Sequence, residues 1–129
     1  MFVTVGTKLT TIVSSVINNT YNFWKKLPDW YPYACVVPWT AVEEVQSNNT
    51  NIMELAYRIE IYFKNQDIAT TEWEFRTALD SIMTLLRNDY TLTWSVLNWR
   101  REIETWYSAD AEPLRMAVIK CIYKACVTI

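Results

Sequence analysis

The chain has 129 residues and a mass of 15.3 kDa, with 51% hydrophobic and 20% charged residues. This length suits one domain with its own core, and the composition excludes a disordered or fibrous chain. Histidine is absent and glycine occurs once, at Gly6. These absences exclude His-dependent triads, His-ligated zinc and Gly-rich phosphate loops. We therefore expect one domain over residues 1–129 without the residues that the commonest enzyme classes require.

The charge balance says little about partners. Twelve basic and fourteen acidic residues give a net charge of −2, and only Lys25-Lys26 and Arg100-Arg101 are adjacent basic pairs. Nucleic-acid binding ordinarily requires a clustered basic face. The sequence therefore argues against a dedicated nucleic-acid-binding protein.

The three cysteines, Cys35, Cys121 and Cys126, have no C-x-x-C spacing and no histidine to complete a metal site. We expect all three to be reduced and buried, because a cysteine in an apolar run packs as a small hydrophobic residue. Three cysteines without a disulfide favour a reducing compartment. No stretch has the character of a secretory signal, and the apolar run 30–42 is too short for a membrane span. A soluble intracellular protein is therefore expected.

The first part of the chain predicts one helix and two strands. Apolar residues spaced three to four apart from Val5 to Ile17 predict a helix that ends at Asn18-Asn19. The segment Tyr21–Trp24 is typical of a short strand. The run Pro32–Pro38 is typical of a buried strand bounded by prolines.

The middle of the chain has the clearest periodicity. The segment Ala41–Asn51 is polar and acidic, which suits either a long loop or a hairpin arm. Strict alternation follows up to Lys64 and predicts a half-exposed strand. One face of that strand consists of Leu55, Tyr57, Ile59, Ile61 and Phe63.

A second helix and two strands are expected after the turn at residues 65–67. Thr71 and Glu74 form a capping-box pattern, which predicts a helix start at Thr71. The helix stripe consists of Phe75, Ala78, Leu79, Ile82, Leu85 and Leu86. In a strand over residues 95–106, Leu97, Trp99 and Ile103 share one face with Arg101. A final strand sets Ala117, Ile119, Cys121, Tyr123, Ala125 and Val127 on one face.

The resulting order, α-β-β-β-α-β-β, predicts an α+β fold with a mostly antiparallel sheet and two helices packed on one face. If the alternation is right, one core contains Tyr57, Ile59, Ile61, Leu79, Ile82 and Ile119.

No catalytic, cofactor-binding or metal-binding residue is predicted, and no cofactor. Paired carboxylates can catalyse hydrolysis when burial separates their pKa values. Here Glu43 and Glu44 lie in the polar arm, and Glu72 and Glu74 open a helix, where negative charge suits the helix dipole. A carboxylate-only enzyme nevertheless remains an alternative.

The seven tryptophans are too many for one core of this size. They are Trp24, Trp30, Trp39, Trp73, Trp94, Trp99 and Trp106. Their spacing does not suggest a base-stacking platform, whereas tryptophan is common in protein-binding hot spots. Two interpretations stay open: three or four lie in the core and the rest are partly exposed, or Trp73, Trp94 or Trp106 lies in a subunit interface.

The order of several short motifs resembles the tail terminator and tail completion proteins of long-tailed bacteriophages, of the phage lambda type. The motifs are the start Thr-Val-Gly-Thr-x-Leu at 4–9, the Tyr-Pro strand at 31–38, the polar arm 43–51, the alternating strand 57–63, the helix 75–87 with Asp89-Tyr90-Thr91-Leu92, and the strand 114–119. The resemblance spans nearly the whole chain.

This resemblance implies a structural role and no reaction. It implies a ring, of six subunits in that family, that caps the tail tube, stops its polymerisation and offers a head-joining surface. The implied partners are the chain itself, the tail tube protein and a head–tail connector or neck protein, with DNA passing through without specific binding and no membrane. The implied location is the virion tail, assembled in the host cytoplasm.

A closed ring needs two different patches on each subunit. The interface candidates are Glu43, Glu44, Asn48, Asn49, Trp73, Trp94 and Trp106. A head-closure or neck protein of the same virion and a small monomeric binding module are the alternatives.

Overall fold

The computed structural model describes residues 2–24, 30–45, 50–64, 67–88, 96–108 and 114–128. In chain order the elements are α1 (Phe2–Ser14), β1 (Thr20–Tyr21), β2 (Tyr33–Val45), β3 (Thr50–Lys64), α2 (Ile68–Asn88), β4 (Val96–Ser108) and β5 (Leu114–Thr128). This is the predicted α-β-β-β-α-β-β order, so the α+β fold is confirmed.

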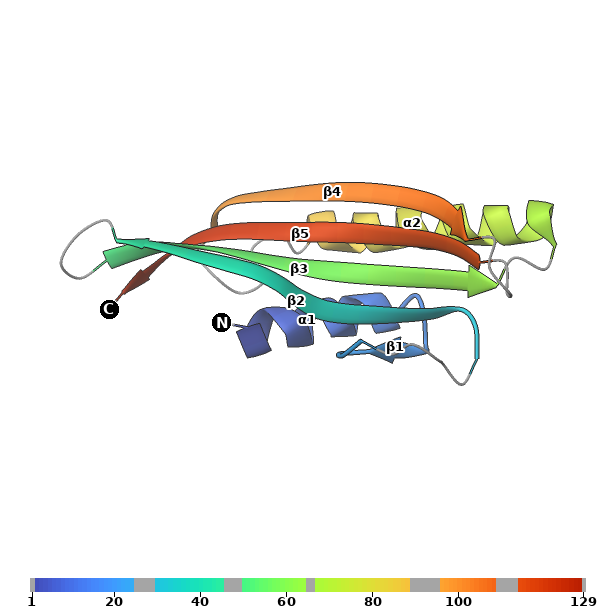
Figure 1. Cartoon of the computed structure of the whole chain (residues 1–129), viewed down its shortest axis with the longest axis horizontal. Helices are drawn as coiled ribbons and strands as arrows, with labels where there is room; N and C mark the ends of the chain where they lie inside the picture. Colours follow the sequence, from blue (N-terminus) through green and yellow to red (C-terminus); the bar gives the residue numbers. More distant parts are fainter. Residues whose placement is uncertain are drawn as a thin grey trace.

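The described strands form one five-stranded sheet in the order β1-β2-β3-β5-β4. Only the short β1–β2 pair is parallel, and the other three pairs are antiparallel. Figure 1 looks onto the sheet, with α1 and α2 both behind it. We call the side covered by the helices the helix face and the other side the open face.

The core lies between the helix face and the two helices. Its centre is Ile59 of β3 beside Ile119 of β5, both fully buried and directly paired. The helices contribute Val5, Leu9, Val13, Phe75, Ala78, Ile82 and Leu86. The predicted core is confirmed, because Tyr57, Ile59, Ile61, Ile82 and Ile119 belong to this cluster and Leu79 packs against it.

The first helix begins and ends three residues earlier than predicted, and the first strand is shorter than predicted. Helix α1 ends at Ser14, and Ile17 is buried beyond the helix, where its amide donates to the carbonyl of Val13 at 2.8 Å. Strand β1 holds two residues and does not reach Trp24, which is 59% exposed. The apolar run thus predicted the core residues correctly, but it did not predict the residue at which the helix ends.

The predicted capping box at Thr71 is wrong. Helix α2 begins at Ile68, and the Asp67 carboxylate accepts a bond from the Thr70 amide at 3.4 Å, as an N-cap residue does. The Thr71 amide donates to the Asp67 carbonyl at 2.8 Å and is already helical. Asp67 caps the helix one turn earlier than predicted. Leu85, expected in the apolar stripe, is 37% exposed.

The polar segment after Pro38 is a hairpin arm. Strand β2 continues through Pro38 to Val45, with a bulge at Trp39, and pairs with β3 from Asn51 onward. We define the arm as residues 40–45 and 50–54. In Figure 1 it extends to the left beyond both helices, together with the end of β5. Asn48 and Asn49 lie outside the described residues.

The bounds of the last two strands match the predicted bounds within two residues. One prediction of burial, for Cys126, is wrong. Trp99, Arg101 and Ile103 share the helix face of β4, and Ala117 to Ala125 of β5 are buried at alternate positions, as predicted. Cys126 is exposed, so the expectation that all three cysteines are buried is wrong. Alternation places Cys126 on the open face at the arm, where no helix covers it.

Candidate interaction surface

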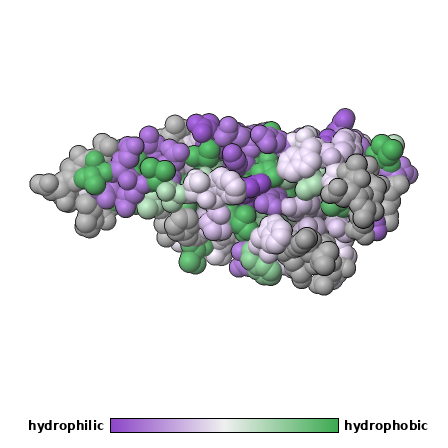
Figure 2. Space-filling model, in the orientation of Figure 1, coloured by the Kyte–Doolittle hydropathy of each residue, from purple (hydrophilic) through white to green (hydrophobic). Residues whose placement is uncertain are grey.

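The open face of the sheet is the largest part of the described molecule that no helix covers. Figure 2 shows strongly hydrophilic residues over the upper edge and the left half of this face, with paler residues toward the right. Across the strands, Thr40, Ala56, Ile122 and Arg100 form one row. The rows on either side are mostly charged, with Glu54 and Lys124 in one and Arg58, Lys120 and Glu102 in the other, so polar rows flank the apolar pair of Ala56 and Ile122.

An aromatic cluster covers the end of the open face where β1 meets β2. The rings of Tyr33 and Tyr62 are stacked with centroids 4.5 Å apart. Tyr31 meets Tyr33 at 5.4 Å, Tyr21 meets Tyr33 at 6.3 Å, and Phe23 meets Tyr21 at 5.5 Å. Edge-to-face and stacked pairs of this kind stabilise by about 0.5–1.5 kcal/mol each beyond burial alone. The cluster therefore replaces a covering helix at this end.

Glu60 is the one carboxylate buried beneath this cluster among the described residues, at 7% exposure. The Tyr62 hydroxyl donates to Glu60 Oε1 at 2.5 Å, and Arg58 Nε lies 3.7 Å from Glu60 Oε2. The Arg58 guanidinium also lies 4.2 Å from the centre of the Trp39 ring. Burial, and then the bond to Glu60, raises the pKa of Tyr62 above its ordinary range. Its hydroxyl remains a donor at neutral pH.

The charges on the open face are interleaved. Glu102 faces Lys120 directly, and Glu54 faces Lys124. Arg100 lies 3.7 Å from Glu102. Opposite charges at directly paired positions stabilise a sheet, and they leave no contiguous basic patch here. Such a face does not suit binding to a phosphate backbone.

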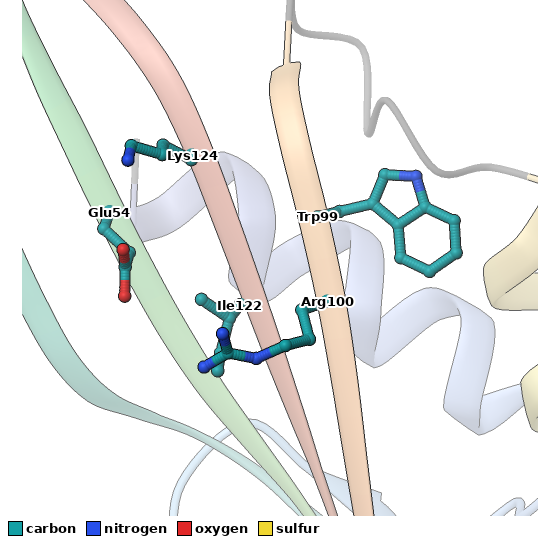
Figure 3. Close-up of a pocket in the computed structure, with 5 residues that line it drawn as sticks. All are labelled: Glu54, Trp99, Arg100, Ile122 and Lys124. Atoms are coloured by element: carbon teal, nitrogen blue, oxygen red, sulfur yellow. The ribbon is translucent and has the colours of Figure 1, made fainter.

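A hollow of about 150 Å³ lies on this face, lined by Glu54, Trp99, Arg100, Ile122 and Lys124 (Figure 3). Arg100 extends over β5 toward Ile122, while the Trp99 ring lies beyond the outer edge of β4. Pockets for small molecules usually measure about 300–1,000 Å³. The hollow is too small to enclose a substrate of ordinary size.

Outside the open face, the strongest charged cluster is centred on Glu72 of α2. Arg115 donates to both carboxylate oxygens at 2.8 and 3.1 Å, Tyr107 donates at 2.8 Å and Arg76 at 3.0 Å. The bonds from Arg115, and then from Tyr107, lower the pKa of Glu72 to about 2. The bonds from Arg115 and Tyr107 join α2 to β5 and β4, and the bond from Arg76 lies within α2, so the cluster ties the start of α2 to the sheet.

The described residues contain no group of three or more histidine, cysteine, aspartate or glutamate side chains that could hold a metal ion. Within the same residues, no helix has the length and apolarity needed to cross a membrane.

The predicted interface residues lie at two separate ends of the molecule. Glu43 and Glu44 are exposed on the arm. Trp73 is 69% exposed near the start of α2, and Trp106 is 38% exposed near the end of β4. Figure 1 places these ends of α2 and β4 opposite the arm. Asn48, Asn49 and Trp94 lie outside the described residues.

None of the six described tryptophans lies in the core. Trp24, Trp30, Trp39, Trp73, Trp99 and Trp106 are all between 38% and 69% exposed. Of the two interpretations left open by the sequence, the one with three or four core tryptophans is therefore wrong. The core is one layer between a sheet and two helices, and aliphatic side chains with a few Phe and Tyr rings fill it. The six described tryptophans therefore lie at the surface.

Sequence reasoning missed the aromatic cluster and did not decide between a long loop and a hairpin for the arm. The signal for the cluster was Tyr62, Glu60 and Arg58 alternating on the second face of β3, read only as a polar face. The signal for the arm was the β-branched pair Val42 and Val45 flanking Glu43-Glu44 without glycine or proline.

Comparison with known proteins identifies the fold but no family. No protein-family model matches the chain, and no curated protein matches its sequence. Among solved structures, the chain is similar to one from the virion of a native gene transfer agent particle. The TM-score is 0.55 at 11% identity, over 88% of this chain and 84% of that one. At this identity the likeness shows a shared fold.

Proposed function

We propose that this chain is a structural protein of a phage-type virion. More specifically, it acts as a tail terminator: a ring of subunits that caps the finished tail tube, stops tube polymerisation and provides the surface that joins the head. The observation that carries the proposal is the fold shared with a chain of the gene transfer agent virion over most of both chains. The order of sequence motifs supports the same assignment.

The surface of the molecule suits assembly. A closed ring needs two different patches on each subunit, because its contacts run head to tail. The two long edges of the sheet differ: the arm edge carries Glu43 and Glu44, and the β4 edge carries Arg100 and Arg101. Exposed tryptophans such as Trp73 and Trp106 at the other end supply large contact area for a further partner.

The polar clusters support a structural role over an enzymatic one. Glu72 and Glu60 are each held by an arginine and a tyrosine among the described residues. Arg115 of β5 and Tyr107 of β4 hold Glu72, and Arg58 and Tyr62 of its own strand hold Glu60. A catalytic carboxylate needs a cleft in which a substrate can reach it. The hollow beside Arg100 is too small for that purpose.

The proposed partners follow from the ring. They are further copies of the chain, six in all as in the family that its sequence resembles, the tail tube protein on one side and a head–tail connector or neck protein on the other. DNA passes through the ring without specific binding, which suits a face of interleaved charges. The site of action is the virion tail, after assembly in the host cytoplasm.

The test is a tube polymerisation assay. Purified tail tube protein is polymerised with and without this protein, and tube lengths are measured by electron microscopy. The proposal predicts tubes that stop growing when the protein is added, with a ring of density at one end. Tubes that grow to the same length, together with binding to head-side neck proteins alone, would instead assign the head-closure role. Binding to neither component contradicts a virion role.

A further inference from the structure

Both long edges of the sheet lack a strand partner in the described part of the chain. Strand β1 pairs with β2 only at Ala34 and Cys35, so the outer edge of β2 from Val37 to Val45 has no partner strand there. Strand β4 is the last strand on the other side of the sheet. Long unpaired edges are templates for pairing with another chain, and proteins usually shorten or cover them. Here each edge strand has 13 residues.

We propose that neighbouring subunits join by antiparallel pairing of these two edges, with Glu44 of one copy opposite Arg100 of the next and Glu43 opposite Arg101. The occupant of each edge is thus a second copy of this chain. This inference rests on the ring proposed above and names the contact that closes it.

Charge and side-chain faces select this register. Glu44 and Arg100 both lie on the open face, and Glu43 and Arg101 both lie on the helix face, so each pair falls on one side of the joined sheet. Opposite charges at directly paired positions are favourable, and like charges are not. A shift of two residues in one direction places Glu44 opposite Glu102. A shift of two residues in the other direction leaves Glu44 without an arginine opposite it and places Glu43 opposite Trp99, so both charge pairs are lost.

The same register pairs exposed apolar side chains. It places Val45, which is 76% exposed, opposite Trp99, and Ala41 opposite Ile103, which is 43% exposed. Pairs of an aromatic with a β-branched residue are among the favourable cross-strand pairs. In Figure 3 the Trp99 ring already lies beyond the outer edge of β4, on the side where the next subunit would pair.

The register also gives the stagger that a closed sheet needs. Within one subunit, Thr40 shares a row with Arg100, through Ala56 and Ile122. Placing Glu44 beside the next subunit's Arg100 therefore shifts each copy by four residues across four strands. At about 3.3 Å per residue and about 4.8 Å per strand, this shift tilts the strands by about 35°. Closed barrels have strand tilts of about 35–45°.

Disulfide trapping tests the register. Glu44→Cys and Arg100→Cys are introduced together in a Cys126→Ser background, because Cys126 is exposed. Directly paired residues have Cα atoms about 4.5–5.5 Å apart, within the range for a disulfide. The control, Val42→Cys with Arg100→Cys, lies on the same face but two residues out of register, about 7–8 Å away. Oxidised samples are separated on non-reducing gels, and their masses are measured by light scattering.

On the non-reducing gel, the inference predicts a ladder of covalent oligomers for Glu44→Cys/Arg100→Cys. The control should run mainly as a single chain on the same gel, because its cysteines are too far apart to form a disulfide. A ring-sized mass without cross-links, or with cross-links only in the control, overturns the inference and leaves the proposed function standing. Failure to assemble, both alone and on tail tubes, contradicts the proposed function itself.

Charge exchange provides an independent measurement that needs no new disulfide. Glu44→Arg or Arg100→Glu alone places like charges at the contact and should raise the concentration for half-assembly by roughly tenfold or more. The double variant Glu44→Arg/Arg100→Glu should restore assembly to within about threefold, because opposite charges again face each other. Both residues are exposed, so the monomer fold should be unchanged by circular dichroism. Equal effects of the single and double variants overturn the pairing.

Discussion

Arg115 of β5 holds Glu72 of α2 through two parallel bonds, Nε to Oε2 at 2.8 Å and Nη2 to Oε1 at 3.1 Å. The Glu72 side chain is 16% exposed and that of Arg115 is 11% exposed, so water screens the pair only partly. The guanidinium also lies 4.6 Å from the Phe75 ring and 4.2 Å from the Tyr107 ring. This pair fixes the start of α2 against the sheet.

Replacing Glu72 should make stability depend less on pH. Arg115 and Tyr107 lower the pKa of Glu72 from 4.5 to about 2 in the folded protein. Its stabilising effect is therefore complete above pH 4.5 and is lost as the pH falls through about 2. Glu72→Gln should cost about 1–3 kcal/mol at pH 7, and the difference from the native protein should shrink toward pH 2. Urea unfolding at several pH values measures this.

The matched control for that experiment is Glu74→Gln, which removes an exposed carboxylate from the same helix turn. It should change the free energy of unfolding by less than about 0.5 kcal/mol. An equal loss in both variants would show that general charge on α2, and not the pair with Arg115, is responsible.

Gly6 should not tolerate alanine, although alanine ordinarily stabilises a helix by about 1 kcal/mol relative to glycine. A Cβ atom on Gly6 would lie 2.7 Å from the Tyr57 hydroxyl and 3.2 Å from Tyr57 Cζ. Tyr57 is buried at 4% exposure and has little room to move. We expect Gly6→Ala to lower stability by about 1–3 kcal/mol.

Removing the clashing oxygen provides the check. In a Tyr57→Phe background the same Gly6→Ala change should cost clearly less, because the 2.7 Å contact no longer exists. Thermal unfolding of the four proteins completes a double-mutant cycle. An additive cycle contradicts the proposed contact.

The core prediction concerns Ile59 and Ile119, which are fully buried and directly paired. Either residue changed to alanine should lower the free energy of unfolding by about 2–5 kcal/mol. Ile68→Ala is the control, because Ile68 is 69% exposed, and it should cost less than about 1 kcal/mol. Small effects at Ile59 and Ile119 would place the core elsewhere.

Thiol reactivity should separate the three cysteines. Cys126 is exposed, whereas Cys35 and Cys121 are buried, and burial raises the pKa of Cys121 to about 11. A chromogenic thiol reagent at pH 8 should therefore label one cysteine quickly in the native protein and three after denaturation. Cys126→Ser should abolish the fast phase. Two or more fast thiols in the native protein contradict the described packing of β2 and β5.

Local patterns predicted the elements well. The alternation from Leu55 to Phe63 and the helical stripe through Phe75 and Ile82 each depend on residues near in sequence. Both patterns identified the buried side correctly, and with it the α+β fold. The start of α2 was misplaced by one turn because Asp67 and Thr71 are both good N-cap residues.

The surface could not be predicted in the same way, because its contacts join distant positions. Arg115 is 43 residues from Glu72, and nothing local to either marks the pair. The Tyr33–Tyr62 stack depends on the β2–β3 register, which is set by a hairpin arm that the sequence alone did not distinguish from a long loop. The six described tryptophans lie at the surface, because the single core layer between the sheet and the helices is filled by smaller side chains. The size of that layer depends on how the elements pack, which local sequence patterns do not show.

The central claim is that this chain assembles into a closed ring, and its mass in solution tests this most directly. Light scattering should be recorded over a range of concentrations, alone and with tail tubes added. Six copies of the 15.3 kDa chain would weigh about 92 kDa, and a plateau at that mass is the predicted result. A mass of 15.3 kDa at every concentration, with no binding to tubes, contradicts the account.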